Sequence, residues 1–122
     1  MDNSFIDAFY QIGIANIRKN DYNSAMQSLK KALDLNPDHS QSWNLVGFTH
    51  EKKEEFDAAL AAYDQAIKYK SDFAEAYYNK GNTLKSKLQH EEAINSYSKA
   101  IEFDPNLSLC LLYTSPSPRD RS

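Results

Sequence analysis

Small and bulky apolar residues recur along the chain with a fixed spacing of 34 residues. Gly13, Gly47 and Gly81 fall in register, and they are the only three glycines of the chain. Five further positions per unit, two alanines, two bulky apolar residues and one aromatic residue, keep the same spacing. These sets are Ala25, Ala59 and Ala93; Ala32, Ala66 and Ala100; Leu29, Tyr63 and Tyr97; Leu33, Ile67 and Ile101; and Phe9, Trp43 and Tyr77. Because chance does not place every glycine in register, the pattern predicts three copies of one structural unit.

Within each unit the apolar spacing is that of α-helices. Phe9 and Gly13 belong to a stripe with the i, i+3, i+4, i+7 spacing of one helix face, and a second stripe begins at Tyr22 after a polar break. The breaks lie at residues 19–21, 53–55 and 87–89. They predict short turns, and Asn20 is suited to the left-handed conformation that ends a helix. Pro37 is expected to stop the second helix of its unit, as Pro105 does in the third. Each unit is therefore a predicted helical hairpin with roughly 14 residues per helix.

The recurring small residues indicate how the hairpins close. A glycine inside a helix costs about 1 kcal/mol relative to alanine, so three in register imply a shared packing reason. We expect the second helix of each hairpin to approach the first closely at Gly13, Gly47 and Gly81. The alanine at position 25, 59 or 93 is expected to face this contact, and the alanine at position 32, 66 or 100 to admit the next unit.

These features resemble the tetratricopeptide repeat (TPR) family. The matching segments read "WNLVGFTHEKKEEFDAALAAYDQAIKYK" and "YYNKGNTLKSKLQHEEAINSYSKAIEFDPN". The resemblance extends over three full repeats, 6–39, 40–73 and 74–107, which form the expected TPR domain at 6–107. It implies an all-α fold, a right-handed α-solenoid of antiparallel helical hairpins (the TPR superhelix). Three positions depart from the family pattern, and they predict a looser third repeat. They are Lys80 for an aliphatic residue, Ser71 for proline and His90 for an aromatic residue.

Residues 108–122 are expected to hold the truncated start of a fourth repeat followed by a non-native, disordered tail. Leu111 fits the bulky position of a fourth unit, but the Ser-Pro-Ser-Pro sequence at 115–118 breaks any helix. The stretch "CLLYTSPSPRD" resembles the translation of a transposase sequencing adapter, so the natural coding sequence is expected to end near Leu109. The alternatives are Ser-Pro phosphorylation sites, a proline-rich ligand and a reactive Cys110.

Composition narrows the class of protein. The net charge is −3, the charged fraction is 25% and the mean hydropathy is −0.70, so we expect a soluble chain that does not bind nucleic acid, where a basic stripe would be typical. No apolar run reaches the roughly 18 residues of a membrane span. The single cysteine excludes a disulfide within the chain, and no signal peptide is recognisable. We therefore expect an intracellular, cytoplasmic protein that does not bind membranes.

Residue types that carry chemistry are scattered along the chain. His39, His50 and His90 lack the i, i+3 or i+4 spacing of a helical metal site, and the three glycines lie inside helices and not in a phosphate loop. No nucleophile sits in a recognisable catalytic motif. The sequence thus predicts a non-catalytic protein with no metal and no cofactor.

Recognition of a protein or peptide is the remaining function. Stacked hairpins form a superhelix whose concave wall is lined by the first helix of each unit. Residues off the packing stripe of these helices are the candidate partner-binding set, and the three asparagines among them are suited to hold the amides of an extended peptide. The set is Tyr10, Ile14, Ile17, Arg18, Asn44, Leu45, Phe48, Lys52, Tyr78, Asn79, Asn82 and Lys85. The alternative is that some of the apolar members pack between adjacent first helices.

One partner of the family can be examined by residue. Members that grip the C-terminal carboxylate of heat-shock chaperones carry lysine, asparagine and arginine at five positions of the first helices. The matching positions here are Tyr10, Ile14, Leu45, Glu75 and Asn79. None matches, and Glu75 would repel a carboxylate. The resemblance therefore predicts no binding of a chaperone C-terminal carboxylate.

Three functions remain open at this point. The first is a peptide- or protein-binding scaffold. The second is the recruiting arm of a larger enzyme, for example a glycosyltransferase, whose catalytic part is missing from this fragment. The third is an architectural solenoid that assembles through its ends. We also expect self-association through the uncapped third repeat, because terminal repeats usually carry a polar capping face, whereas Ile94, Tyr97 and Ile101 are apolar.

Overall fold

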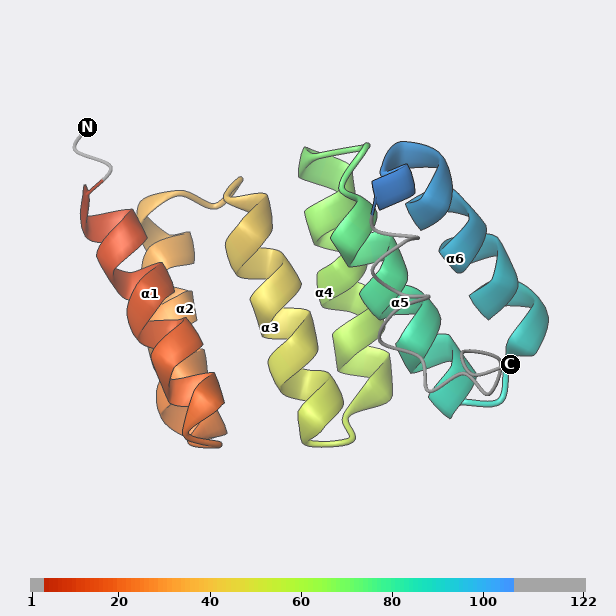
Figure 1. Ribbon diagram of the computed structural model, residues 1–122. Helices are drawn as coiled ribbons and strands as arrows, with labels where there is room; N and C mark the ends of the chain where they lie inside the picture. Colours follow the sequence, from red (N-terminus) through yellow and green to blue (C-terminus); the bar gives the residue numbers. More distant parts are fainter. Residues whose placement is uncertain (1–3, 107–122) are drawn as a thin grey trace, which may run out of the picture.

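The computed structural model describes residues 4–106, and the expectations for residues 108–122 lie outside that range. The described chain folds into six α-helices that form three antiparallel hairpins, stacked side by side in chain order (Figure 1). The helices are α1 (Ser4–Arg18), α2 (Tyr22–Leu35), α3 (Ser40–Lys52), α4 (Phe56–Tyr69), α5 (Ala74–Ser86) and α6 (His90–Phe103). They confirm the all-α solenoid of helical hairpins that the sequence predicts.

Each hairpin turns at a residue with left-handed backbone conformation. Asn20 has the predicted positive φ, 63°, and the residues in register with it, Glu54 and Leu88, have φ values of 62° and 65°. In the first turn the backbone N–H of Asp21 donates to the carbonyl oxygen of Asn16 at 2.8 Å, which satisfies a carbonyl at the end of α1. The side chain of Asp21 then accepts from the backbone N–H of Ser24 and caps α2. One short turn therefore both ends α1 and starts α2.

The glycines lie where the two helices of a hairpin come closest, as predicted. A Cβ atom on Gly47 would be 2.6 Å from Cδ1 and Cε1 of Tyr63, and one on Gly81 would be 2.8 Å from the same ring atoms of Tyr97. A Cβ on Gly13 would be 2.9 Å from Cδ2 of Leu29. The nearest group to each glycine is thus the bulky residue of the second helix. The expected alanines, at positions 25, 59 and 93, are buried close by.

Adjacent hairpins are joined by apolar contacts of the second helix with the next first helix. Leu29 of α2 and Val46 of α3 share a cluster with Ala62, and Ala66 of α4 shares another with Ala76 of α5. Among the described helices, α1 also contacts α3 and α3 contacts α5, whereas no contact of similar extent links α2 to α4 or α4 to α6. The first helices therefore lie closer together than the second helices, which places α1, α3 and α5 on the inner wall of the curved stack.

Candidate functional site

The inner wall is the candidate partner-binding surface, and the structure places most of the predicted set on it with part of each side chain accessible. Arg18, Lys52 and Lys85 are exposed, and Asn44 is buried. The remaining members are half-buried. They are Tyr10, Ile14, Ile17, Leu45, Phe48, Tyr78, Asn79 and Asn82.

Tyr10 and Leu45 make packing contacts within the stack. Both side chains pack against the cluster formed by Leu29, Val46 and Ala62. The ring of Tyr10 also meets the imidazole of His39 edge to face, with centroids 5.5 Å apart. Burial, and then the negative charge of Glu75, raises the pKa of Tyr10. These two residues therefore join the first helices to the core at the N-terminal end of the wall.

Asn44 departs from its expected place. Only 4% of its surface is exposed, because its side chain points from α3 toward α5. There its Oδ1 accepts a hydrogen bond from Nδ2 of Asn79 at 3.1 Å. Asn82 likewise accepts from the hydroxyl of Tyr97. The expectation that Asn44 stands open on the wall is thus corrected, since an amide pair across the wall holds it. Asn79 and Asn82 keep exposed surface, although one polar atom of each is already bonded.

Positive charge lies on the wall, together with half-buried aromatic rings. Lys52 places its Nζ 5.1 Å from the ring centroid of Phe48, so a half-buried aromatic ring and an ammonium group stand together. Tyr78 packs against Tyr97 with centroids 5.7 Å apart. Within residues 4–106 no ion pair involves Arg18, Lys52 or Lys85. Three cations therefore lie near the ends of α1, α3 and α5 with no carboxylate neutralising them.

A buried polar pair supports the centre of the wall from behind. Tyr63 is fully buried, and its hydroxyl donates to Oε1 of Glu51 at 2.8 Å. Burial, followed by the negative charge of Glu51, strongly raises the pKa of Tyr63. The phenol therefore stays protonated and keeps donating. The hydroxyl thereby holds the carboxylate of Glu51 in place.

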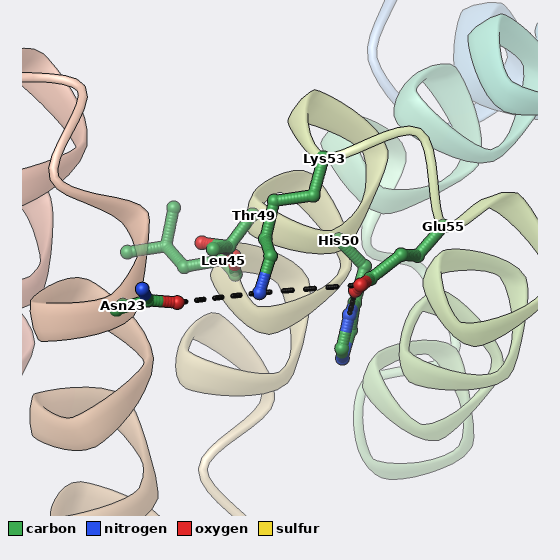
Figure 2. Close-up of polar contacts among 6 residues, drawn as sticks. All are labelled: Asn23, Leu45, Thr49, His50, Lys53 and Glu55. Carbon is green, nitrogen blue, oxygen red and sulfur yellow. Dashed lines mark hydrogen bonds and ion pairs between the residues drawn. The ribbon is translucent and has the colours of Figure 1, made fainter.

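Lysines that follow the first helices bond to the preceding hairpin. Nζ of Lys53 donates to Oδ1 of Asn23 at 3.4 Å and lies 4.0 Å from Glu55 (Figure 2). Glu55 also bonds Nδ1 of His50 at 2.7 Å, and this hydrogen bond is the main cause of the lowered pKa of Glu55. In the next unit Lys87 pairs with Asp57 in the same register. Sequence reasoning missed these contacts, although the 34-residue register of the four partners could have indicated them.

A cavity of about 650 Å³ opens where α2 meets α3. Its floor is apolar, and the indole N–H of Trp43 donates to the carbonyl oxygen of Pro37 at its edge. The equivalent positions at the next junction hold an ion pair between Lys80 and Asp64 at 2.8 Å. The lining residues are Met26, Lys30, Leu33, Asp34, Pro37, Trp43, Val46 and His50. The cavity was not predicted, because its size depends on the separation of two hairpins and not on any motif.

No group of three or more His, Cys, Asp or Glu side chains in residues 4–106 is arranged to hold a metal ion. None of the described helices is long and apolar enough to cross a membrane.

Comparison with solved structures finds the same fold in proteins of known structure. MamA matches with a TM-score of 0.77 at 27% identity, over 88% of this chain and 63% of that chain, so this chain spans less than two thirds of MamA. The O-GlcNAc transferase of Thermobaculum terrenum (mutant K341M) matches with a TM-score of 0.80 at 25% identity, over 84% of this chain and 20% of that chain. The first TPR domain of Spaghetti (RPAP3), bound to the HSP90 peptide SRMEEVD, matches with a TM-score of 0.81 at 19% identity, over 87% of this chain and 84% of that chain.

Comparison at the level of sequence gives the family. No curated protein matches the chain significantly. Family profiles described as tetratricopeptide repeat match residues 6–39 and 74–107, and one described as TPR repeat matches residues 52–88. Repeats of this kind serve protein interactions. The chain, with its three glycine-centred hairpins, belongs to the tetratricopeptide repeat family.

Proposed function

We propose that this chain is a non-catalytic scaffold that binds a peptide or protein segment along the concave wall of α1, α3 and α5. The wall offers half-buried apolar groups that a partner can cover, among them Ile14, Phe48 and Tyr78. It also offers amide groups on Asn79 and Asn82 that are suited to hydrogen bonds with an extended backbone. TPR domains of the same fold hold peptides in the structures of Spaghetti (RPAP3).

The observation that carries this proposal is the group of exposed cations on the wall, where Lys52 lies beside the ring of Phe48. Lys53, Lys80 and Lys87, at the junctions between hairpins, each lie within 4.0 Å of a carboxylate. Arg18, Lys52 and Lys85 on the wall have no ion pair within residues 4–106 and are exposed. Unpaired cations beside half-buried aromatic rings favour a segment that carries acidic and apolar side chains.

The test is a selection of binders from a random peptide library, followed by affinity measurements with single variants. We expect Phe48→Ala and Lys52→Ala each to weaken binding of the selected peptides by about tenfold, as loss of one good contact does. Tyr69→Ala and Lys99→Ala remove an aromatic ring and a lysine from α4 and α6, away from the wall, and should leave the affinity unchanged. Equal affinities for all four variants would place the peptide elsewhere.

The HSP90 peptide SRMEEVD makes a sharper probe, because it is bound in two structures of the same fold. We propose that this chain does not hold it, since Tyr10, Ile14 and Leu45 stand where carboxylate-gripping members carry lysine and asparagine. Tyr10 and Leu45 are also packed into the core. Fluorescence anisotropy with the labelled peptide should show no saturable binding in the micromolar range. Micromolar binding would contradict this specificity but not the use of the wall.

A second candidate is the recruiting arm of a larger enzyme. The likeness to the O-GlcNAc transferase of Thermobaculum terrenum favours it, because this chain covers 84% of its own length but only 20% of that enzyme. In that case the wall would present a protein to a catalytic domain encoded downstream. Sequencing the complete gene separates the two candidates, because only the arm requires a following transferase domain.

A further inference from the structure

The two end faces of the stack repeat the surfaces that its internal junctions bury. Phe5, Ala8 and Ile12 of α1, here called the α1 outer face, are exposed, with Phe5 at 62% and Ile12 at 46%. They are in register with residues that α3 and α5 turn toward the preceding second helix. Those counterparts are Ser42 and Ala76 at 0% exposure, Val46 at 6%, Phe73 at 8%, and the half-buried His39 and Lys80. The face that packs against the preceding second helix in α3 and α5 is therefore exposed in α1.

The opposite end shows the complementary surface. Ile94, Tyr97 and Ile101 of α6, here called the α6 outer face, lie in register with residues of α2 and α4 that the next hairpin covers. Ile94 is 61% exposed and Ile101 is 43% exposed, whereas their counterparts are at least half-buried. Tyr97 is half-buried, and its counterpart Tyr63 is sealed completely. The α6 outer face therefore exposes apolar residues at the positions where α2 and α4 pack against the next first helix.

Charge supports the same pairing. At both internal junctions the lysine after a first helix bonds a polar side chain in the first turn of the preceding second helix. The two pairs are Lys53 with Asn23 and Lys87 with Asp57. The residue 34 positions before Lys53 is Lys19, which directly follows α1. The residue 34 positions after Asp57 is Glu91, in the first turn of α6. Both are exposed, and neither has an ion pair within residues 4–106. The two ends thus carry opposite charges in the register of the internal pairs.

We propose that copies of this chain stack head to tail, with the α6 outer face of one copy on the α1 outer face of the next. Lys19 of one copy then pairs with Glu91 of the other, as Lys87 pairs with Asp57 within the chain. Because the two faces differ, the contact does not close on itself, and association continues beyond the dimer. The concave walls of successive copies join into one longer wall, so this assembly is separate from peptide binding and leaves the wall free.

The proposal is tested by analytical ultracentrifugation of the full 122-residue chain over a range of concentrations. The weight-average mass should rise with concentration past that of a dimer. Ile12→Asp and Ile101→Asp should each raise the concentration needed for association by at least about tenfold. Both positions are partly exposed, so the variants should fold, which circular dichroism verifies. Leu88→Asp introduces the same charge at a side chain that is 75% exposed but off both faces, and should change nothing.

Mixing the two aspartate variants gives the decisive result. An equimolar mixture of Ile12→Asp and Ile101→Asp retains one intact pair of faces, so it should form dimers and stop there. For the charges, Lys19→Glu alone should weaken association about two- to fivefold, and the double variant Lys19→Glu with Glu91→Lys should restore it. A chain that stays monomeric at all concentrations, as it would if residues 107–122 covered α6, overturns the proposal. So does a dimer that Ile12→Asp leaves intact, which would indicate pairing of two α6 faces.

Discussion

Replacing Gly47 with alanine is expected to destabilise the protein, although alanine is the better helix former. The new Cβ would lie 2.6 Å from two ring atoms of Tyr63 and 3.0 Å from a third. Ordinary contact begins at 3.4 Å, so the ring must move by about 0.8 Å. It cannot move freely, because Tyr63 is fully buried and its hydroxyl is bonded to Glu51.

The magnitude follows from three opposing contributions. Overpacking a core by one carbon costs about 2 kcal/mol, and weakening a hydrogen bond to a charged acceptor costs about 1.5 kcal/mol. Alanine at a helix interior regains about 1 kcal/mol. We therefore expect Gly47→Ala to lower the free energy of unfolding by about 2.5 kcal/mol, which corresponds to a fall in Tm of roughly 10–20 °C for a domain of this size.

Gly13→Ala is the matched control in the first hairpin. Its nearest neighbour is the flexible end of Leu29 at 2.9 Å, which can yield more readily than a bonded aromatic ring, so the net change should lie within about 1 kcal/mol of zero. Urea denaturation followed by circular dichroism measures both variants. In a Tyr63→Leu background, Gly47→Ala should cost less than in the parent chain. A higher Tm for Gly47→Ala than for the parent would refute the packing argument and leave helix propensity as the dominant effect.

Three further predictions concern single side chains. Leu88 holds a φ of 65°, which is unfavourable for a residue with a Cβ, so Leu88→Asn, which introduces the residue found at the equivalent position 20, should raise the free energy of unfolding by about 1 kcal/mol in the same urea assay. Burial lowers the pKa of His39 from 6.5, so the unfolded state binds more protons, and the free energy of unfolding should decrease as the pH is lowered through 6.5; His39→Gln should flatten this dependence, and an NMR titration giving a pKa above 6.5 would contradict it. Trp43→Phe loses the indole bond to Pro37 and should lower the free energy of unfolding by about 1–2 kcal/mol, a loss that Trp43→Ala should exceed.

The sequence was sufficient for the architecture because the architecture depends on residue volume and register. Glycines and alanines repeated at one spacing determine where two helices can meet, and the structure has its close contacts at those glycines. The turn conformation was foreseen only at Asn20. Glu54 and Leu88 adopt it as well, although neither side chain favours it, since the packing of the two flanking helices overrides local preference.

The candidate site was less accessible to sequence reasoning. Asn44 and Asn79 are not in the same register position, and their hydrogen bond arises from the curvature between α3 and α5. Such a contact between units has no signal in either unit alone. The same holds for the packing of Tyr10 into a cluster whose members come from three other helices.

Within residues 4–106, extensive contact between hairpins is confined to hairpins that are neighbours in the chain. A force that pulls the two ends apart would therefore act on every junction between hairpins, and each junction would open separately. The junction of α2 with α3 contains a cavity of about 650 Å³ and should give way before that of α4 with α5, where Lys80 and Asp64 form an ion pair between the hairpins. Elastic extension without loss of the hairpins themselves is a mechanical property that a compact globular core does not offer.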